Sequence, residues 1–203
     1  MEEIALFPLP LVLVPGEQAP LHVFEPRYKE LVDESLDTAE PFGLLLADED
    51  GVREVGTLAS VVEVVERFDD GRLNIVVEGR DRFRVARLTE GRPFQTAEVD
   101  ALEDEGDEPT EDERERCLAG YDKVIAAAAA ELEELDRDAN DLSFRIAARI
   151  DLGPEIKQTL LESQSERERV VRLAGLLDRA AEAVAREREV RERSAGNGRV
   201  EAL

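Results

Sequence analysis

Length, composition and charge exclude several classes of protein. The chain has 203 residues, 42% of them hydrophobic, and its 49 acidic and 26 basic side chains give a formal net charge of −23. Such a charge repels nucleic-acid phosphates and anionic membranes, and no apolar run reaches the roughly 20 residues that span a bilayer. The charge therefore predicts no nucleic-acid or membrane partner. The single cysteine, Cys117, cannot form an intramolecular disulfide, and we expect a cytoplasmic protein.

The apolar segment Ile4–Val14 is the first feature along the chain, and it invites interpretation as a signal peptide. Glu2 and Glu3 stand where a signal peptide carries basic residues, and prolines interrupt the apolar run. We therefore predict short extended pieces here instead. The next strand is predicted at Leu21–Phe24.

A helix is predicted to begin at Pro26, because proline suits the first turn of a helix. Apolar residues then recur at helical spacing and give this helix one buried stripe. The stripe consists of Tyr28, Leu31, Val32 and Leu36. Phe42–Ala47 follows as a short apolar run, typical of a buried strand.

The clearest hairpin signal in the chain is Asp69-Asp70-Gly71. It separates Leu58–Val65 from Leu73–Val77, and Asp-Gly supplies the positive φ that a tight turn requires. Gly79 interrupts the second strand, which predicts a bulge or a close approach of another backbone segment.

Two more strands are predicted, at Arg80–Leu88 and Phe94–Leu102, because apolar and polar residues alternate there. The first hundred residues therefore contain five or six short strands and a single early helix. This pattern favours a small closed or half-closed barrel over residues 1–102.

The composition changes beyond the predicted barrel. Residues 103–115 are mostly acidic and are interpreted as a flexible connector. Residues 116–193 are predicted to form a helical subdomain, in which Ser165 and Glu168 have the spacing of a capping box. Residues 194–203 are predicted to be a disordered tail.

The order of these pieces resembles the N-terminal substrate-binding domain of Lon proteases. Residues 6–28 (LFPLPLVLVPGEQAPLHVFEPRY) resemble the opening of that family, residues 77–85 (VEGRDRFRV) a later landmark, and residues 142–177 its helical half. The resemblance covers about residues 4–180. It implies an α+β fold, with a PUA-like β pseudobarrel followed by a C-terminal helical bundle, in a stand-alone member without ATPase or peptidase domains.

The sequence lacks the motifs of an ATPase and of a Lon peptidase. A phosphate-binding loop needs a Gly-Lys pair, whereas the three lysines follow Tyr28, Asp122 and Ile156. Lon carries its serine–lysine peptidase in a separate domain that has no counterpart in this sequence. The resemblance therefore implies no catalytic residue and no cofactor. It implies a non-catalytic module that captures exposed or unfolded protein segments and could pass them to a separate protease.

The only histidine, His22, leaves one enzymatic alternative open. As a general base it would make the protein an unrecognised hydrolase, but no nucleophile lies near it in the sequence. The alternative is a structural role, in which the imidazole bonds to a turn or a carboxylate. One histidine and one cysteine cannot supply the three or four ligands of a zinc site, so no metal is expected.

Two stretches are candidates for contact with a protein segment. Leu11–Val14 is a run of four apolar residues that a strand cannot bury on one side, so part of it is exposed unless the C-terminal helices cover it. Glu25–Tyr28 either begins a helix, with Arg27 bonded to a carboxylate, or forms the rim of a peptide site. The candidate substrate-binding residues are Leu11, Val12, Leu13, Val14, His22, Phe24, Glu25, Arg27 and Tyr28.

A stripe of arginines leaves nucleic-acid binding open as a third function. Arg80, Arg82 and Arg84 alternate along one predicted strand and could bind an anion or RNA, as some PUA-like folds do. Against this, residues 1–109 carry 27 acidic and 10 basic side chains, and arginines along a strand commonly pair with neighbouring acids. Cys117, a lone thiol in a predicted helix, is expected to be inert.

Overall fold

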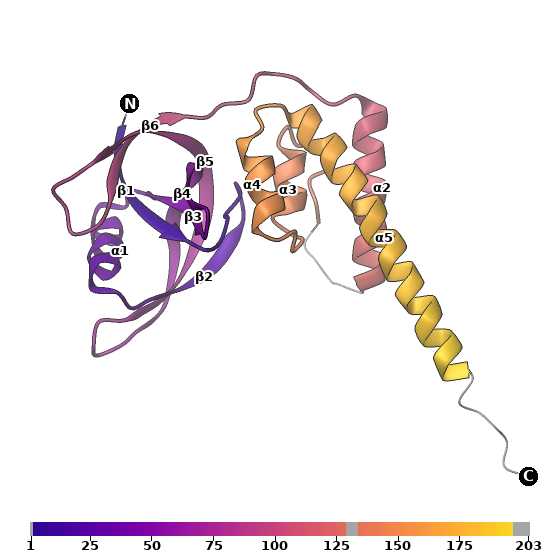
Figure 1. Ribbon diagram of the computed structural model, residues 1–203, viewed down its shortest axis with the longest axis horizontal. Coiled ribbons are helices and arrows are strands. Elements are labelled where there is room, and N and C mark those ends of the chain that lie inside the picture. The colour runs from indigo at the N-terminus through magenta and orange to yellow at the C-terminus, as the bar shows by residue number, and fades with distance from the viewer. Residues whose placement is uncertain (1, 129–133, 197–203) are drawn as a thin grey trace, which may run out of the picture. The chain divides into compact units, whose positions relative to one another are not determined.

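The computed structural model describes residues 2–128 and 134–196, with side chains up to residue 183. Within them the chain has an α+β fold, with strands in the first half and helices in the second (Figure 1). The strands are β1 (Glu2–Leu9), β2 (Gln18–Val23), β3 (Phe42–Asp48), β4 (Gly51–Arg67), β5 (Leu73–Thr89) and β6 (Thr96–Ala101). The helices are α1 (Pro26–Thr38), α2 (Glu111–Ala128), α3 (Leu142–Ala147), α4 (Pro154–Glu162) and α5 (Glu166–Gly196). None of these helices is both long and apolar enough to cross a membrane.

The chain divides into two compact units. The first unit comprises Met1–Glu105 and Phe144–Gln164, and the second comprises Gly106–Ser143 and Ser165–Leu203. The strands, α1 and α4 thus belong to the first unit, whereas α2 and α5 belong to the second. Each unit is built from segments that are far apart in the sequence.

The predicted divisions of the chain fall differently from these units. α2 begins at Glu111, inside the predicted connector 103–115. The predicted helical subdomain, 116–193, is shared between the two units, because α4 packs with the barrel strands. Of the predicted tail, 194–203, the first residues continue α5, and residues 197–203 lie outside the described part of the chain.

Six strands close into a PUA-like β pseudobarrel, as the sequence predicted. Neighbouring strands follow the order β2-β5-β4-β3-β1-β6, and β6 pairs with β5 as well. Closure depends on the length of β5, which pairs with β2 over Leu73–Glu78 and with β6 over Phe83–Thr89. The β1–β3 pair is parallel, and the other pairs are antiparallel. Figure 1 shows the strands curled into a ring with α1 against one side.

The proline-rich opening forms a strand only as far as Leu9, so the predicted interruption was wrong at Pro8, through which β1 runs, whereas Pro10 and Pro15 lie outside the strands. β1 pairs with β6 over Glu2–Ala5 and with β3 over Leu6–Leu9. Pro8 lies in the later part, where only the β3 side of the strand is paired. Proline has no N–H to donate, and a strand tolerates it where one edge is free of pairing.

Gly79 lies where another backbone segment crosses β5, which confirms the predicted close approach. A Cβ at this position would lie 2.3 Å from the carbonyl oxygen of Val14. The Gly16 N–H donates to the Gly79 carbonyl at 2.9 Å, and the Gly79 N–H donates to the Glu17 carbonyl at 2.9 Å. Glycine therefore keeps β5 continuous while a loop bonds to it at this residue.

Two apolar clusters fill the first unit. One lies between the sheet and α1, where Tyr28, Leu31 and Val32 of the predicted stripe are buried with Phe7 and Phe42. The rings of Phe7 and Tyr28 stack with their centroids 4.1 Å apart. The second cluster joins β1, β3, β5 and β6 and consists of Ile4, Leu6, Leu45, Phe83, Ala97 and Val99.

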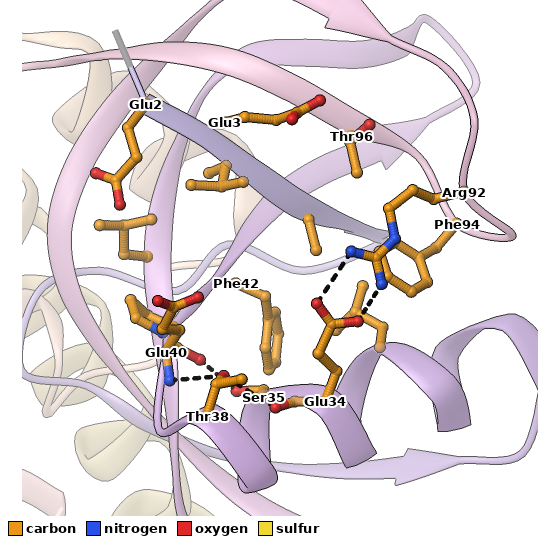
Figure 2. Close-up of a pocket in the computed structure, with 15 residues that line it drawn as sticks. Glu2, Glu3, Glu34, Ser35, Thr38, Glu40, Phe42, Arg92, Phe94 and Thr96 are labelled. Carbon is orange, nitrogen blue, oxygen red and sulfur yellow. Dashed lines mark hydrogen bonds and ion pairs between the residues drawn. The ribbon is translucent and has the colours of Figure 1, made fainter.

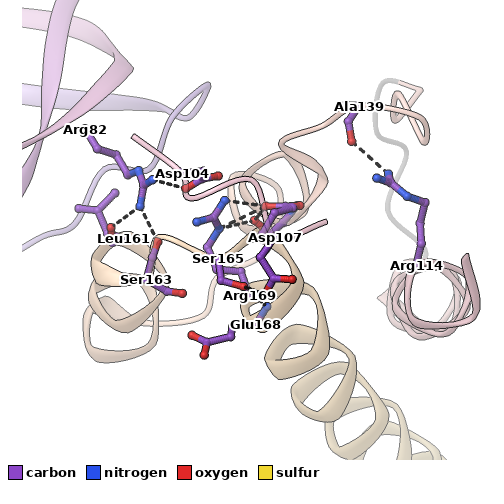
Figure 3. Close-up of polar contacts among 12 residues, drawn as sticks. Arg82, Asp104, Asp107, Arg114, Ala139, Leu161, Ser163, Ser165, Glu168 and Arg169 are labelled. Carbon is purple, nitrogen blue, oxygen red and sulfur yellow. Dashed lines mark hydrogen bonds and ion pairs between the residues drawn. The ribbon is translucent and has the colours of Figure 1, made fainter. Parts of the chain in front are cut away.

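A buried arginine binds the later segment of the first unit to the barrel. Arg82 Nη1 donates to the carbonyl oxygens of Leu161, at 2.8 Å, and Ser163, at 2.6 Å, and its Nη2 bonds to the Asp104 carboxylate (Figure 3). Arg82 is only 6% exposed. Because a buried cation needs oxygen acceptors, these three partners explain how a strand arginine is accommodated inside the unit.

The second unit is formed by α2 and α5, which pack along each other. Gly120 allows their close approach, because a Cβ there would lie 2.9 Å from the Leu177 Cβ. A buried polar network adds to this packing. The Glu166 carboxylate accepts from the Ser143 N–H at 2.8 Å, from the Ser143 hydroxyl at 2.6 Å and from Arg169 Nη2 at 2.7 Å.

Side-chain caps define the starts of both helices. The Ser165 hydroxyl oxygen accepts from the Glu168 N–H at 3.0 Å, which confirms the predicted serine cap of α5. At α2, the Glu113 N–H donates to the Thr110 Oγ1 at 3.3 Å and the Thr110 N–H donates to the Glu113 carboxylate at 2.9 Å. This second capping box explains why α2 begins within the acidic run.

Candidate functional site

The sequence left open whether Leu11–Val14 is exposed or covered, and the structure favours the covered alternative for three of the four residues. Val12, Leu13 and Val14 are 6%, 1% and 0% exposed. Leu13 belongs to the cluster beneath α1, and the half-buried Leu11 packs against this cluster. Leu11 and Val12 also line a small pocket together with Lys157 of α4.

Glu25–Tyr28 begins a helix, as one of the two interpretations from the sequence has it. Pro26 occupies the first turn of α1, as predicted, and the Glu25 side chain makes no capping bond. Arg27 Nε donates to Glu25 Oε2 at 3.0 Å, and the guanidinium lies over the Tyr28 ring. Arg27 and Tyr28 also line a pocket, so this helix start forms part of a rim.

This barrel-mouth pocket has a volume of about 530 Å³. Its apolar side includes Leu6, Leu45 and Val85, which belong to or pack against the β1–β3–β5–β6 cluster. Val52 and Leu88, at its edge, are 55% and 58% exposed. The polar residues that line it are Arg27, Tyr28, Arg53, Glu54, Arg87 and Gln95. Apolar hollows with a few polar groups at barrel mouths are common ligand sites.

Two irregularities in the strands bring arginines to this pocket. The register between β3 and β4 skips residues 53–55 on β4, and the register between β5 and β6 skips Ala86 on β5. Bulges redirect side chains and are frequent at barrel rims. Arg53 lies within the first bulge and Arg87 follows the second, so both side chains reach the pocket lining.

A second candidate surface is made of exposed residues on β4 and at the end of β2, two strands that are separated in the sheet by β5. It consists of His22, Phe24, Val62, Val64 and Val65 and is called the hairpin surface here, because β4 and β5 form the hairpin. Phe24 is 59% exposed, and the valines are 41–58% exposed. The rings of His22 and Phe24 stack with their centroids 5.9 Å apart.

His22 has partners that match its structural interpretation. Its Nδ1 lies 2.6 Å from Asn74 Oδ1, and Asn74 Nδ2 donates to Glu66 Oε2 at 3.2 Å. This chain of contacts crosses β2, β5 and β4. In the described part of the protein, no serine, threonine or cysteine side chain bonds to His22, whereas covalent hydrolysis of the serine–histidine type needs such a nucleophile beside the base. Cys117 is buried, and burial first, with Glu166 second, raises the pKa of its thiol to about 12.

The predicted arginine stripe is not a continuous surface. Arg80 forms an ion pair with Glu78, in which Nη1 lies 2.6 Å from Oε1. This pairing is expected for an arginine beside acids on a strand. Arg82 is buried, so only Arg80 and Arg84 are exposed. An anion that follows the strand would not meet three accessible guanidinium groups.

A second pocket, of about 210 Å³, is smaller than the barrel-mouth pocket, and the charged residues that line it are mainly acids instead of arginines (Figure 2). Glu2, Glu3, Glu34 and Glu40 line it together with Arg92. Figure 2 shows Arg92 bonded to the Glu34 carboxylate, with Nη1 donating to Oε1 at 3.0 Å. Since four glutamates and a single arginine line it, this pocket is unfavourable for an anionic ligand.

Several residues of both candidate surfaces were missed by sequence reasoning. The run Val61–Val65 contains four valines and breaks the alternation of a half-buried strand, which was a usable signal for exposed apolar groups. Arg53 and Arg87 carried no local signal, because a register shift depends on the partner strand.

Residues 3–179 match the family model of the ATP-dependent protease La (LON) substrate-binding domain. The chain belongs to this family. It is 30% identical over 174 residues to the Lon protease of Paraburkholderia phytofirmans, covering 75% of this chain and 21% of that protease. It is 27% identical over 213 residues to the Lon protease of Escherichia coli K12, and this match covers 94% of this chain and 26% of that protease. The chain therefore spans about a fifth to a quarter of the length of these curated relatives.

Solved structures support the family assignment. A Lon N-terminal domain protein from Xanthomonas campestris has a TM-score of 0.67 and 26% identity, covering 86% of this chain and 98% of that protein. The N-terminal domain of the Mycobacterium avium complex Lon protease has a TM-score of 0.65 at 19% identity, and the match covers 87% of this chain and 98% of that domain. At this identity the similarity shows the shared fold alone.

Proposed function

We propose that the protein is a non-catalytic module that binds exposed or unfolded polypeptide segments on its hairpin surface. The observation that carries the proposal is the 59% exposure of Phe24 at the end of β2, in a sheet whose strand β4 also carries exposed valines. Apolar groups gathered on one region of a domain commonly mark interaction sites, and burial of a phenylalanine side chain contributes about 1.5–3 kcal/mol. Membership of a substrate-binding family supports a polypeptide as the ligand.

Charge supports this choice of ligand. The net charge of −23 repels polyanions, but it does not oppose the burial of neutral apolar side chains. Glu63 and Glu66 lie on the same strand as the exposed valines. They favour neutral or basic segments over acidic ones.

Catalysis is not part of the proposed function. The family relationship is to a substrate-binding domain, and His22 is bonded to the amide of Asn74 rather than to a nucleophile. The protein would supply recognition alone, and a separate protease would act on the captured segment. ATP hydrolysis or casein cleavage that persists through re-purification would contradict this proposal.

The binding test uses a fluorescein-labelled peptide of alternating leucine and serine with an amidated C-terminus. We expect Phe24→Ser to weaken its binding about tenfold, which equals about 1.4 kcal/mol, measured by fluorescence anisotropy. Val171→Ser is the matched control, because Val171 is 47% exposed on α5 in the second unit. Equal losses in both variants, or no loss in Phe24→Ser, would rule out the hairpin surface as the binding site.

A further inference from the structure

The barrel-mouth pocket has a local charge opposite to that of the whole protein. Three arginines and one glutamate line it, although acidic residues outnumber basic ones by 49 to 26 in the chain. The acidic pocket, lined by residues of β1, α1 and β6 among others, has four glutamates and one arginine. The lining of the barrel-mouth pocket is therefore richer in guanidinium groups than that of the acidic pocket.

The pocket arginines are held in place by acids but keep donors for a ligand. Arg87 Nη2 donates to Glu98 Oε1 at 2.5 Å, and Arg53 Nη2 donates to Asp48 Oδ2 at 3.0 Å. A guanidinium has five N–H donors, so each group has others to offer.

Apolar side chains beside these cations indicate a ligand of mixed character. Leu6 and Leu45 are each 1% exposed and form the inner surface of the pocket, whereas Leu88, at its edge, is 58% exposed. A purely hydrophilic anion would leave Leu88 in water. A purely apolar ligand would desolvate the arginines without replacing their hydrogen bonds. A ligand that joins a carboxylate to an apolar group satisfies both parts of the lining.

We propose that the barrel-mouth pocket binds the C-terminal carboxylate of a polypeptide together with the apolar side chain of its last residue. The inference rests on the proposed function, because it takes the ligand to be a polypeptide. Phe24 of the hairpin surface precedes Arg27 of the pocket by three residues. A segment on the hairpin surface therefore lies near the start of α1, whose first turn supplies the pocket rim.

The test compares two fluorescein-labelled peptides of alternating leucine and serine that end in leucine, one with a free carboxylate and one amidated. Charge-assisted hydrogen bonds are about twice as strong as neutral ones, so we expect the acid to bind about tenfold more tightly than the amide. Arg87→Gln should remove most of this preference, and Arg87→Lys should retain part of it. Arg116→Gln is the control, because Arg116 pairs with Asp178 in the second unit.

A second variant tests the pocket without removing an arginine. Leu88→Glu places a carboxylate at the pocket edge, and since Leu88 is exposed the fold should be retained, which a thermal melt verifies. The acid preference should disappear in this variant and persist in Val171→Glu. Equal affinity of the two peptides for the unaltered protein would overturn the inference, and so would octanoate displacing the peptide acid more effectively than the unlabelled peptide does.

The outcomes also separate this inference from the proposed function. If the amide binds and depends on Phe24 while the acid gains nothing, the hairpin surface is retained and the pocket inference is wrong. If the acid binds in an Arg87-dependent way while the amide does not bind, the pocket is retained and the proposed hairpin surface is wrong.

Discussion

The two compact units of the protein use buried charge differently. In the first unit, Arg82 is buried against two backbone carbonyls and one carboxylate, within a structure otherwise held by strand pairing and two apolar clusters. In the second unit, Arg169 is 1% exposed and bonds to Glu166, which is 3% exposed. The barrel therefore relies mainly on sheet closure, whereas α2 and α5 rely on a buried ion pair beside their apolar contacts.

This difference has a functional side. Both candidate binding surfaces consist of first-unit residues, where exposed apolar groups and unused arginine donors are tolerated on a stable barrel. In the second unit, charged groups at the buried centre are satisfied by one another. Under the proposed function the barrel would provide the recognition chemistry, whereas the network of the helical unit is buried.

The largest predicted effect follows from breaking the buried network. Glu166→Ala removes a carboxylate from the buried network that contains the Arg169 cation, and breaking buried ion pairs costs about 3–5 kcal/mol. Urea unfolding measures this loss, and Glu111→Ala, an exposed glutamate on α2, is the control. Cys117 reports on the same unit, because its thiol is buried. Maleimide labelling of Cys117 should accelerate in Glu166→Ala, and an unfolding free energy within 1 kcal/mol of the unaltered protein would contradict the role of the network.

A smaller effect is expected at the backbone crossing in the barrel. Gly79→Ala places a Cβ 2.3 Å from the Val14 carbonyl oxygen, and such overpacking costs about 1–3 kcal/mol. Gly175→Ala is the matched control, because its nearest neighbour would be the flexible end of Arg179 at 3.6 Å. Because alanine has a higher helix propensity than glycine, Gly175→Ala within α5 should stabilise the folded protein by about 1 kcal/mol. Loss of stability in both variants, measured by urea unfolding, would show that the Val14 contact is not the cause.

The features that the sequence predicted correctly depend on local spacing. The Asp70-Gly71 turn, the crossing at Gly79 and the buried stripe of α1 are each specified by residues a few positions apart. The family resemblance supplied the fold class. The start of α2 was missed because its capping box, Thr110 with Glu113, is itself part of an acidic run that favoured a flexible connector.

The binding surfaces were only partly predictable, for a physical reason. Arg27 and Phe24 were proposed from the motif at the start of α1, and the structure places them on the pocket rim and on the exposed hairpin surface. The burial of Val12, Leu13 and Val14 depends on tertiary packing, as Leu13 shows by its place among residues of α1 and the strands. The positions of Arg53 and Arg87 depend on register shifts, which only the partner strands determine.

The smallest predicted effect concerns an exposed ion pair in the second unit and contrasts it with the buried pair. Arg167 Nε and Nη2 donate to the Glu113 carboxylate at 2.9–3.1 Å. These bonds first, and the Thr110 N–H second, lower the pKa of Glu113 from its ordinary 4.5 to about 2. Because the folded-state pKa lies below the unfolded value, the carboxylate contributes stability above about pH 4.5, and this contribution is lost as the pH falls toward 2.

Glu113→Gln therefore should destabilise the protein at neutral pH, and the difference from the unaltered protein should shrink as the pH falls below 4.5. Urea unfolding of both proteins from neutral pH down to the acid limit of folding measures the difference. Arg167→Gln removes the main cause of the lowered pKa, so the Glu113→Gln difference should depend less on pH in that background. A difference that is constant across the whole range would mean that the capping geometry, and not the charge of Glu113, provides the stability.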